Sequence, residues 1–129
     1  MTDQNLRKRQ KTVPFRFESL DTWHMARDYA RKVYCATAKF PRHEDHGLRS
    51  QMNRAANSIG LNIAEGLGKG SNKAFEYHLE VAIGSTCEVA AGSFLARDNA
   101  YITNEGQTVR YDEGQKLAKS INAFRTTLS

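Results

Sequence analysis

Residues 48–66 read LRSQMNRAANSIGLNIAEG, and this stretch decides the fold. Its apolar and small side chains recur every three or four residues, which is the period of one face of an α-helix. These residues are Leu48, Met52, Ala55, Ile59, Ile63 and Gly66. At about 100° per residue, a second stripe lies roughly a right angle away and contains Arg54, Ser58, Leu61 and Glu65. A helix with two usable faces suggests one partner inside the chain and another outside it.

The segment before this stretch has the same helical period. Its apolar positions predict a helix from about Glu18 to Ala38, with Trp23 and Tyr34 on the face that we expect in the core. The pair Phe40-Pro41 ends this helix, because proline disfavours helical geometry in the residue before it.

Two more helical segments follow. The glycine-rich residues 66–70 end the first stretch, since glycine readily takes the left-handed conformation at a helix C-terminus. A long helix is then expected from about Asn72 to Asn99, and its small residues between positions 82 and 93 predict close packing against a neighbour. A turn at residues 104–106 separates it from a last helix that begins near Thr108.

None of these segments shows the alternation of apolar and polar residues that is typical of a strand. The sequence therefore predicts an all-α protein. Residues 17–129 are expected to form an antiparallel up-and-down four-helix bundle, and residues 1–16 a basic, flexible N-terminal arm. The two cysteines, Cys35 and Cys87, lie within helical segments, and we expect both to be free thiols.

The positive charge is concentrated at the start of the chain. The formal net charge is +5, and residues 1–16 hold five cations against Asp3 alone, which gives +4 and leaves +1 for the other 113 residues. A short basic arm can bind phosphates by releasing their counterions, so nucleic acid is the natural partner class. The alternative is a solvated or non-native terminus that only aids solubility. The candidate nucleic-acid-binding residues are Arg7, Lys8, Arg9, Lys11, Arg16, Arg49, Lys69 and Lys73.

The chain shows no run of about eighteen or more apolar residues, and its first residues are polar and basic. We therefore expect neither a membrane span nor a secretory signal, and a cytoplasmic location.

Several short motifs occur together in this chain. Their centre consists of Arg54-Ala55-Ala56, Ser58-Ile59, the run Asn62 to Gly66, and Gly84-Ser85 with Glu88. They extend to Phe17 to Leu20, Trp23, Tyr34, Thr37, Phe40-Pro41, Glu44, Gly47-Leu48 and Gln51. Together these motifs resemble a known family, the four-helix-bundle proteins encoded in intervening sequences of large-subunit ribosomal RNA genes. The resemblance covers about residues 17–103.

The resemblance implies a four-helix protomer that assembles into a homopentameric ring. The chain is also similar to the accessory proteins of diversity-generating retroelements, which implies nucleic acid and a reverse transcriptase as partners. Two positions depart from the family pattern: Gly60-Leu61 stands where proline and a small residue are common, and Thr86-Cys87 where leucine is usual. A ring needs two different contact faces, and the helix at residues 48–66 offers both. The number five rests on the resemblance alone.

A second group of candidate residues has a structural or interface role. Asn62 and Glu65, one helical turn apart, could contact a ligand or a neighbouring subunit, but a structural hydrogen-bonding role is favoured. Glu88 is expected to pair with Arg54 or another cation, either between helices or between subunits. The full group is Arg54, Ser58, Asn62, Glu65, Gly66, Gly84, Ser85 and Glu88.

The sequence offers no pattern for catalysis, a metal or a cofactor. The run His43 to His46 has the composition of a metal site, but adjacent loop residues do not converge easily on one ion. His24 and His78 have no second ligand at zinc-motif spacing and are expected to be surface or partly buried side chains. Residues 68–71 lack the order of a phosphate-binding loop, and no nucleophile has a base at a recognisable spacing.

We therefore expect a non-enzymatic homo-oligomer that binds nucleic acid, with RNA favoured over DNA, through basic residues. The alternative is a protein-interaction scaffold that docks a partner protein such as a reverse transcriptase. A small hydrolase or nuclease is the third and least favoured class. The dependence of binding on salt separates the first class from the second.

Overall fold

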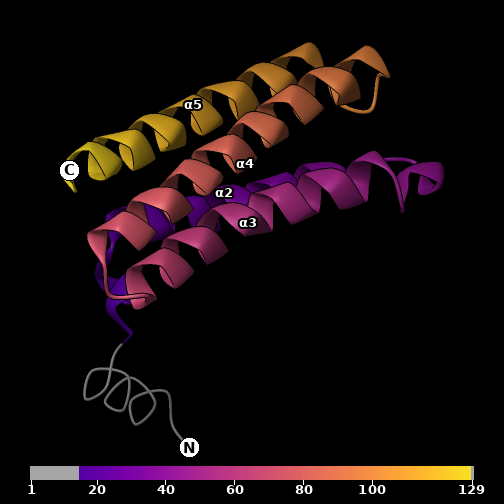
Figure 1. Cartoon of the computed structure of the whole chain (residues 1–129). Helices are drawn as coiled ribbons and strands as arrows, with labels where there is room; N and C mark the ends of the chain where they lie inside the picture. The colour runs from indigo at the N-terminus through magenta and orange to yellow at the C-terminus, as the bar shows by residue number, and fades with distance from the viewer. Residues whose placement is uncertain (1–14, 129) are drawn as a thin grey trace, which may run out of the picture.

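The computed structural model of the chain describes residues 15–128. Four α-helices are present: α2 (Asp21–Thr37), α3 (Leu48–Gly68), α4 (Asn72–Asp98) and α5 (Asn104–Thr126). Two short 3-10 turns, η1 (Arg16–Ser19) and η2 (Arg42–Glu44), precede α2 and α3. Residues 15–128 contain no strand, so the predicted all-α class is confirmed (Figure 1).

The helices form two pairs that lie against each other (Figure 1). Helix α3 packs against α2 on one side and most extensively against α4 on the other, and α4 also packs against α5. The contact between α2 and α5 is smaller. The turn between α3 and α4 lies at one end of the molecule, and the turn between α4 and α5 lies at the other.

Two helix starts differ from the prediction. Residues 16–19 form η1, and the Glu18 carboxylate accepts a hydrogen bond from the Phe15 amide at 2.9 Å, so the first helix begins only at Asp21. The last helix begins at Asn104, because the Thr103 hydroxyl accepts a hydrogen bond from the Gly106 amide at 3.0 Å and caps it. The turn predicted at residues 104–106 is therefore wrong.

The end of α3 also lies later than expected. Gly66 is buried inside the helix, which continues to Gly68, and the glycine with a positive φ (80°) is Gly70. Ser71 then caps α4, since its hydroxyl accepts a hydrogen bond from the Ala74 amide at 3.1 Å.

The core takes apolar side chains from all four helices. Its largest fully buried apolar residues are Val33, Ile59, Ile63, Leu79, Val89, Leu117 and Ile121. Trp23 is half-buried against this core, but Tyr34 is 45% exposed, so its predicted place in the core is wrong. The Tyr34 hydroxyl reaches across to α3 and accepts a hydrogen bond from Asn57 at 2.7 Å. Cys35 and Cys87 are free and exposed.

The small residues of α4 divide between its two faces. Ala82, Gly92 and Ser93 are buried, and a Cβ atom on Gly92 would come within 2.7 Å of the Met52 side chain of α3. Gly84 is exposed with open space around it. The predicted close packing is therefore confirmed for the inner face of α4 only.

Helix α4 is long and apolar enough to cross a membrane by length and composition, with a mean hydropathy of 1.3 over its most apolar window. The helix packs against both α3 and α5, and nine of its residues are buried. The core helix of a bundle meets the same criterion, because it is apolar on more than one side.

Tyr29 fixes the smaller contact between α2 and α5. Its buried hydroxyl donates to the Arg110 carbonyl at 3.3 Å, and a Cβ atom on Gly114 would lie 2.8 Å from that hydroxyl. Burial, reinforced by the nearby Glu113 charge, raises the pKa of Tyr29 to about 12.

The raised pKa of Tyr29 predicts a loss of stability at high pH. The unfolded chain releases this proton near pH 10 and the folded protein only near pH 12, so the stabilisation is complete below pH 10 and is lost as the pH rises to about 12. Tyr29→Phe should remove this part of the pH dependence, and Tyr77→Phe, at a 61% exposed tyrosine, should keep it. Urea unfolding at a series of pH values measures the difference. Identical pH profiles for the two variants would contradict the burial of Tyr29.

Candidate functional site

A row of polar side chains crosses the contact between α3 and α4. The Asn62 amide group donates to the Ser58 carbonyl at 2.8 Å and to its hydroxyl at 2.9 Å. The Ser85 hydroxyl of α4 donates to the Ser58 hydroxyl at 2.9 Å, and Asn62 Oδ1 lies 2.9 Å from His78 Nδ1. We call Ser58, Asn62, His78 and Ser85 the polar seam.

The hydrogen bonds of the polar seam determine which ring nitrogen of His78 carries a proton. The Ser58 carbonyl can only accept, so the Asn62 NH₂ group must face it, and Asn62 Oδ1 must accept from His78 Nδ1. Glu65 Oε2 lies 3.9 Å from the same nitrogen, and the Glu65 side chain is 59% exposed. The seam is thus internally satisfied, with Glu65 at its solvent edge.

Gly66 makes the close approach at the seam possible. A Cβ atom at this position would lie 2.5 Å from the Cβ of His78 and 3.1 Å from the Phe75 ring. No side chain larger than hydrogen fits there without moving α4 away from α3. The role of Gly66 is therefore in helix packing, and not in ending the helix.

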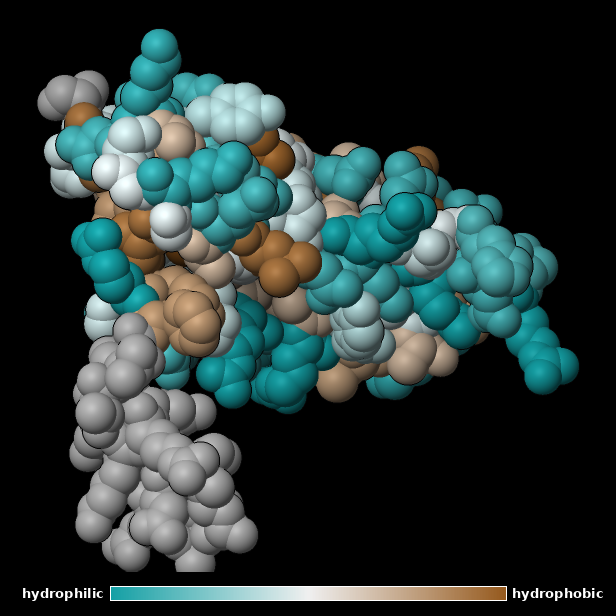
Figure 2. Space-filling view, turned by 60° about the horizontal axis from the view of Figure 1, so that its bottom comes forward, coloured by the Kyte–Doolittle hydropathy of each residue, from teal (hydrophilic) through white to brown (hydrophobic). Residues whose placement is uncertain are grey.

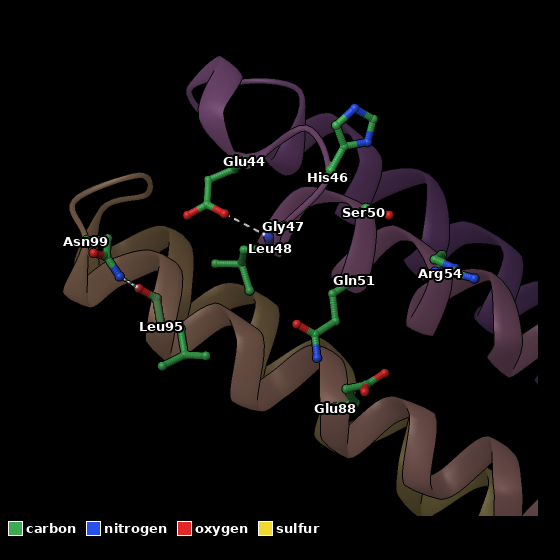
Figure 3. A pocket seen from close by; sticks show the side chains of 10 residues that line it. All are labelled: Glu44, His46, Gly47, Leu48, Ser50, Gln51, Arg54, Glu88, Leu95 and Asn99. Carbon is green, nitrogen blue, oxygen red and sulfur yellow. Dashed lines mark hydrogen bonds between the residues drawn. The ribbon is translucent and has the colours of Figure 1, made fainter.

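Nearer the start of α3, a groove of about 660 Å³ lies between α3 and α4. Figure 3 shows Gln51 and Arg54 of α3 on one side of this groove and Glu88 and Leu95 of α4 on the other. Arg54 and Glu88 are exposed, and no ion pair joins them within residues 15–128. An ion pair of either residue with another subunit stays a prediction.

Glu44 closes the end of the groove and is fully engaged in hydrogen bonds. Its carboxylate accepts from the Leu48 amide at 2.9 Å, as Figure 3 shows, and from the Tyr101 hydroxyl at 2.8 Å. These bonds, with the Leu48 amide first, hold the pKa of Glu44 below its usual value. His43 Nε2 lies 2.9 Å from the same Tyr101 hydroxyl. This cluster ties η2 to the turn between α4 and α5.

Among residues 15–128, no group of three or more His, Cys, Asp or Glu side chains is arranged to hold a metal ion. The polar seam likewise contains no pairing of a nucleophile with a free base, because Ser58 and Asn62 accept each hydrogen that the seam directs at them. The arrangement can fix helix register and present charge, and we assign no reaction to it.

The candidate nucleic-acid-binding residues lie in three places. Arg7, Lys8, Arg9 and Lys11 lie outside the described residues. Arg16, Lys69 and Lys73 are exposed at one end of the bundle, because η1 packs beside Leu67 and Gly68 at the end of α3. Figure 2 shows hydrophilic side chains over much of this face, with apolar atoms between them.

Arg49 differs from the other described cations. It pairs with Asp45 at 2.8 Å and donates to the Phe40 carbonyl, so its guanidinium group is held inside the chain. The described part of the chain shows no such ion pair for Lys69 or Lys73. These two lysines are therefore more available to a partner than Arg49.

His78 was not predicted as a site residue. It is only 7% exposed, so it is more deeply buried than the surface or partly buried side chain that was expected. A signal was present, because His78 stands three residues after Phe75 and four before Ala82, on the face of α4 that is buried. A polar residue at such a position needs a hydrogen-bond partner, and Asn62 provides it.

The family model described as 23S rRNA-intervening sequence protein matches residues 18–123. A crystal structure of a protein of unknown function from the S23 ribosomal protein family of Bacteroides thetaiotaomicron has a similar fold, with a TM-score of 0.71 and 20% sequence identity. The similarity covers 80% of this chain and 96% of that chain. No curated protein matches the chain.

The close approach at Gly66 predicts opposite effects for two alanine variants of α3. Gly68→Ala, where a Cβ meets nothing within 4 Å, should stabilise the protein by up to about 1 kcal/mol through helix propensity. Gly66→Ala should destabilise it by about 1–3 kcal/mol, because the added methyl group overlaps His78. Urea unfolding at one protein concentration measures both. Equal stabilities would show that α3 and α4 are not closely packed at this point.

Proposed function

Because the chain belongs to the 23S rRNA-intervening sequence protein family, we propose that it is a non-enzymatic, cytoplasmic protein that binds nucleic acid as a homo-oligomer. RNA is the favoured ligand over DNA. One observation carries this proposal. The basic residues of the arm join the bundle at η1, the same end at which Lys69 and Lys73 are exposed.

Charge supplies the binding energy in this proposal. Five cations precede Phe17, and each can neutralise about one phosphate and release its counterion. Arg16, Lys69 and Lys73 continue the positive surface onto the folded part of the chain. Contacts of this kind are made to the phosphate backbone, so the expected affinity is micromolar with little sequence preference.

The homo-oligomer that we propose is a ring of five up-and-down four-helix protomers. Residue pairs across each of the four helix contacts support antiparallel neighbours: Thr22 with Ser120, Thr37 with Asn53, Asn62 with His78, and Ser93 with Gln107. We call the second stripe of α3, which contains Arg54, Ser58, Leu61 and Glu65, the lateral stripe. It supports a contact outside the chain, because Arg54, Leu61 and Glu65 are exposed and Leu61 is 67% exposed. Ser58 of that stripe turns into the polar seam instead.

A ring would also strengthen the binding of nucleic acid by the arm. Five copies would place about twenty-five arm cations around one assembly, so weak contacts could sum through multivalency.

The arm predicts a change in the salt dependence of binding. Replacing Arg7, Lys8, Arg9 and Lys11 with alanine should reduce the slope of log affinity against log salt by about 3, since each phosphate contributes about 0.7 to 0.9. Filter binding of a structured RNA at several salt concentrations measures the slope. The control replaces the exposed Lys116 and Lys119 of α5 with alanine and should leave the slope nearly unchanged. If the arm variant keeps both the affinity and the slope of the full chain, the arm is not the binding element.

The lateral stripe predicts the effect of a charge at Leu61. Leu61→Lys should convert the oligomer to monomers, because it buries an unpaired charge in the proposed contact. Val109→Lys, at a 47% exposed residue of α5, is the matched control and should keep the mass of the oligomer. Light scattering measures both, with circular dichroism to verify the helices. A concentration-independent monomer mass for the unaltered chain would refute the assembly.

A second candidate function is a scaffold that docks a partner protein. Exposed aromatic side chains favour it: the rings of Phe94 and Tyr111 lie 5.9 Å apart on α4 and α5, and the Arg97 guanidinium lies 5.0 Å from the Phe94 ring. Aromatic residues and arginine are enriched in protein interfaces. This function takes the lead if the full chain binds no nucleic acid at low salt.

A further inference from the structure

A separate pocket of about 370 Å³ lies between the C-terminal half of α2 and the start of α5. Its charged lining residues are Lys32, Lys39 and Arg110, and no acidic side chain lines it. The groove between α3 and α4, in contrast, is lined by two carboxylates, Glu44 and Glu88, together with Arg54. The pocket is therefore a concave surface at which positive charge converges from two helices.

Two carboxylates behind the pocket hold two of these cations in place. Lys32 Nζ lies 2.8 Å from Glu113 and 3.1 Å from Asp28, and the Arg110 guanidinium lies 2.7 Å from Glu113. Asp28 also pairs with Arg31 at 3.0 Å. The carboxylates fix the directions of Lys32 and Arg110, so little side-chain entropy remains to be lost when a ligand binds.

The two carboxylates do not neutralise the cluster. Asp28 and Glu113 form ion pairs with three cations, Arg31, Lys32 and Arg110. Lys39 is a fourth cation, and it has no ion pair within the described chain. This group of side chains, of which Arg31 lies outside the pocket lining, therefore keeps two uncompensated positive charges. The hydrogen bond that Lys32 donates to Glu113 also raises the pKa of Lys32, so this ammonium group stays charged at neutral pH.

We infer that this pocket binds a phosphate group. Ammonium and guanidinium groups make strong, charge-assisted hydrogen bonds to phosphate oxygens, and the Thr103 hydroxyl lies in the same lining. The volume is in the range of pockets that hold small ligands. The phosphate could belong to a nucleic-acid backbone, which rests on the proposed function, or to a free phosphorylated compound, which does not.

Cys35 makes occupancy of the pocket measurable. It is a free, exposed thiol in the lining, and Cys87 on α4 is an equally free, exposed thiol outside it. A bound phosphate should shield Cys35 from a neutral alkylating reagent and leave Cys87 unaffected. The two thiols of one molecule thus serve as probe and internal control.

The experiment measures the alkylation rates of Cys35 and Cys87 by iodoacetamide on the full chain, with peptide mass spectrometry as the readout. Inorganic pyrophosphate and a structured RNA are the two ligands. At a ligand concentration of about ten times Kd, full shielding should slow the reaction of Cys35 about tenfold. Lys39→Ala should lose most of this protection, and Lys116→Ala, at an exposed lysine elsewhere, should retain it. Circular dichroism verifies that both variants fold.

The outcomes separate the pocket from the proposed function. Protection by both ligands supports a phosphate site that nucleic acid occupies, and protection by pyrophosphate alone supports a site for free phosphorylated compounds. Unchanged Cys35 rates with both ligands, or full protection in Lys39→Ala, would overturn the inference. If RNA binds the chain on filters but neither RNA nor pyrophosphate protects Cys35, the inference about the pocket is wrong while nucleic-acid binding stands.

Discussion

At Gly66 the absence of a side chain lets His78 of α4 lie directly against the backbone of α3. This contact sets the distance between the two helices, and the hydrogen bonds of the polar seam form only at that distance. The same closeness recurs further along the two helices, where Gly92 leaves room for Met52. Because α2 packs against α3, and α5 packs against α4, the positions of all four helices depend on how α3 packs against α4.

The polar seam explains why we place the proposed function at the surface of the bundle and not in its interior. Buried polar groups need partners, and here they satisfy each other, which fixes the register of α3 against α4 and leaves no free reactive group between them. Two groups of cations lie towards opposite ends of the molecule. Arg16, Lys69 and Lys73 form one group, and Lys32, Lys39 and Arg110 form the other.

The sequence predicted the helices well and their contacts less well, for physical reasons. Periodicity located α3 and α4 within two residues at each end, because it reports the buried face directly. The start of α5 was missed because the Thr103 cap is a single side-chain hydrogen bond, which no period reveals. Tyr34 follows the apolar period but lies at the edge of the buried face. The partner of His78, and the pairing of Arg49 with Asp45 beside Phe40, depend on chain geometry that a one-dimensional pattern does not contain.

Helix α4 runs the length of the molecule as one continuous element of 27 residues. At 1.5 Å per residue it is about 40 Å long, and its contacts with α3 and α5 keep it from bending independently of them. Helix α4 therefore keeps the two groups of basic residues, which lie towards opposite ends of the molecule, at a constant separation. One turn of duplex DNA is about 34 Å, so a duplex bound in the way that we propose would need more than one helical turn to reach both ends of α4.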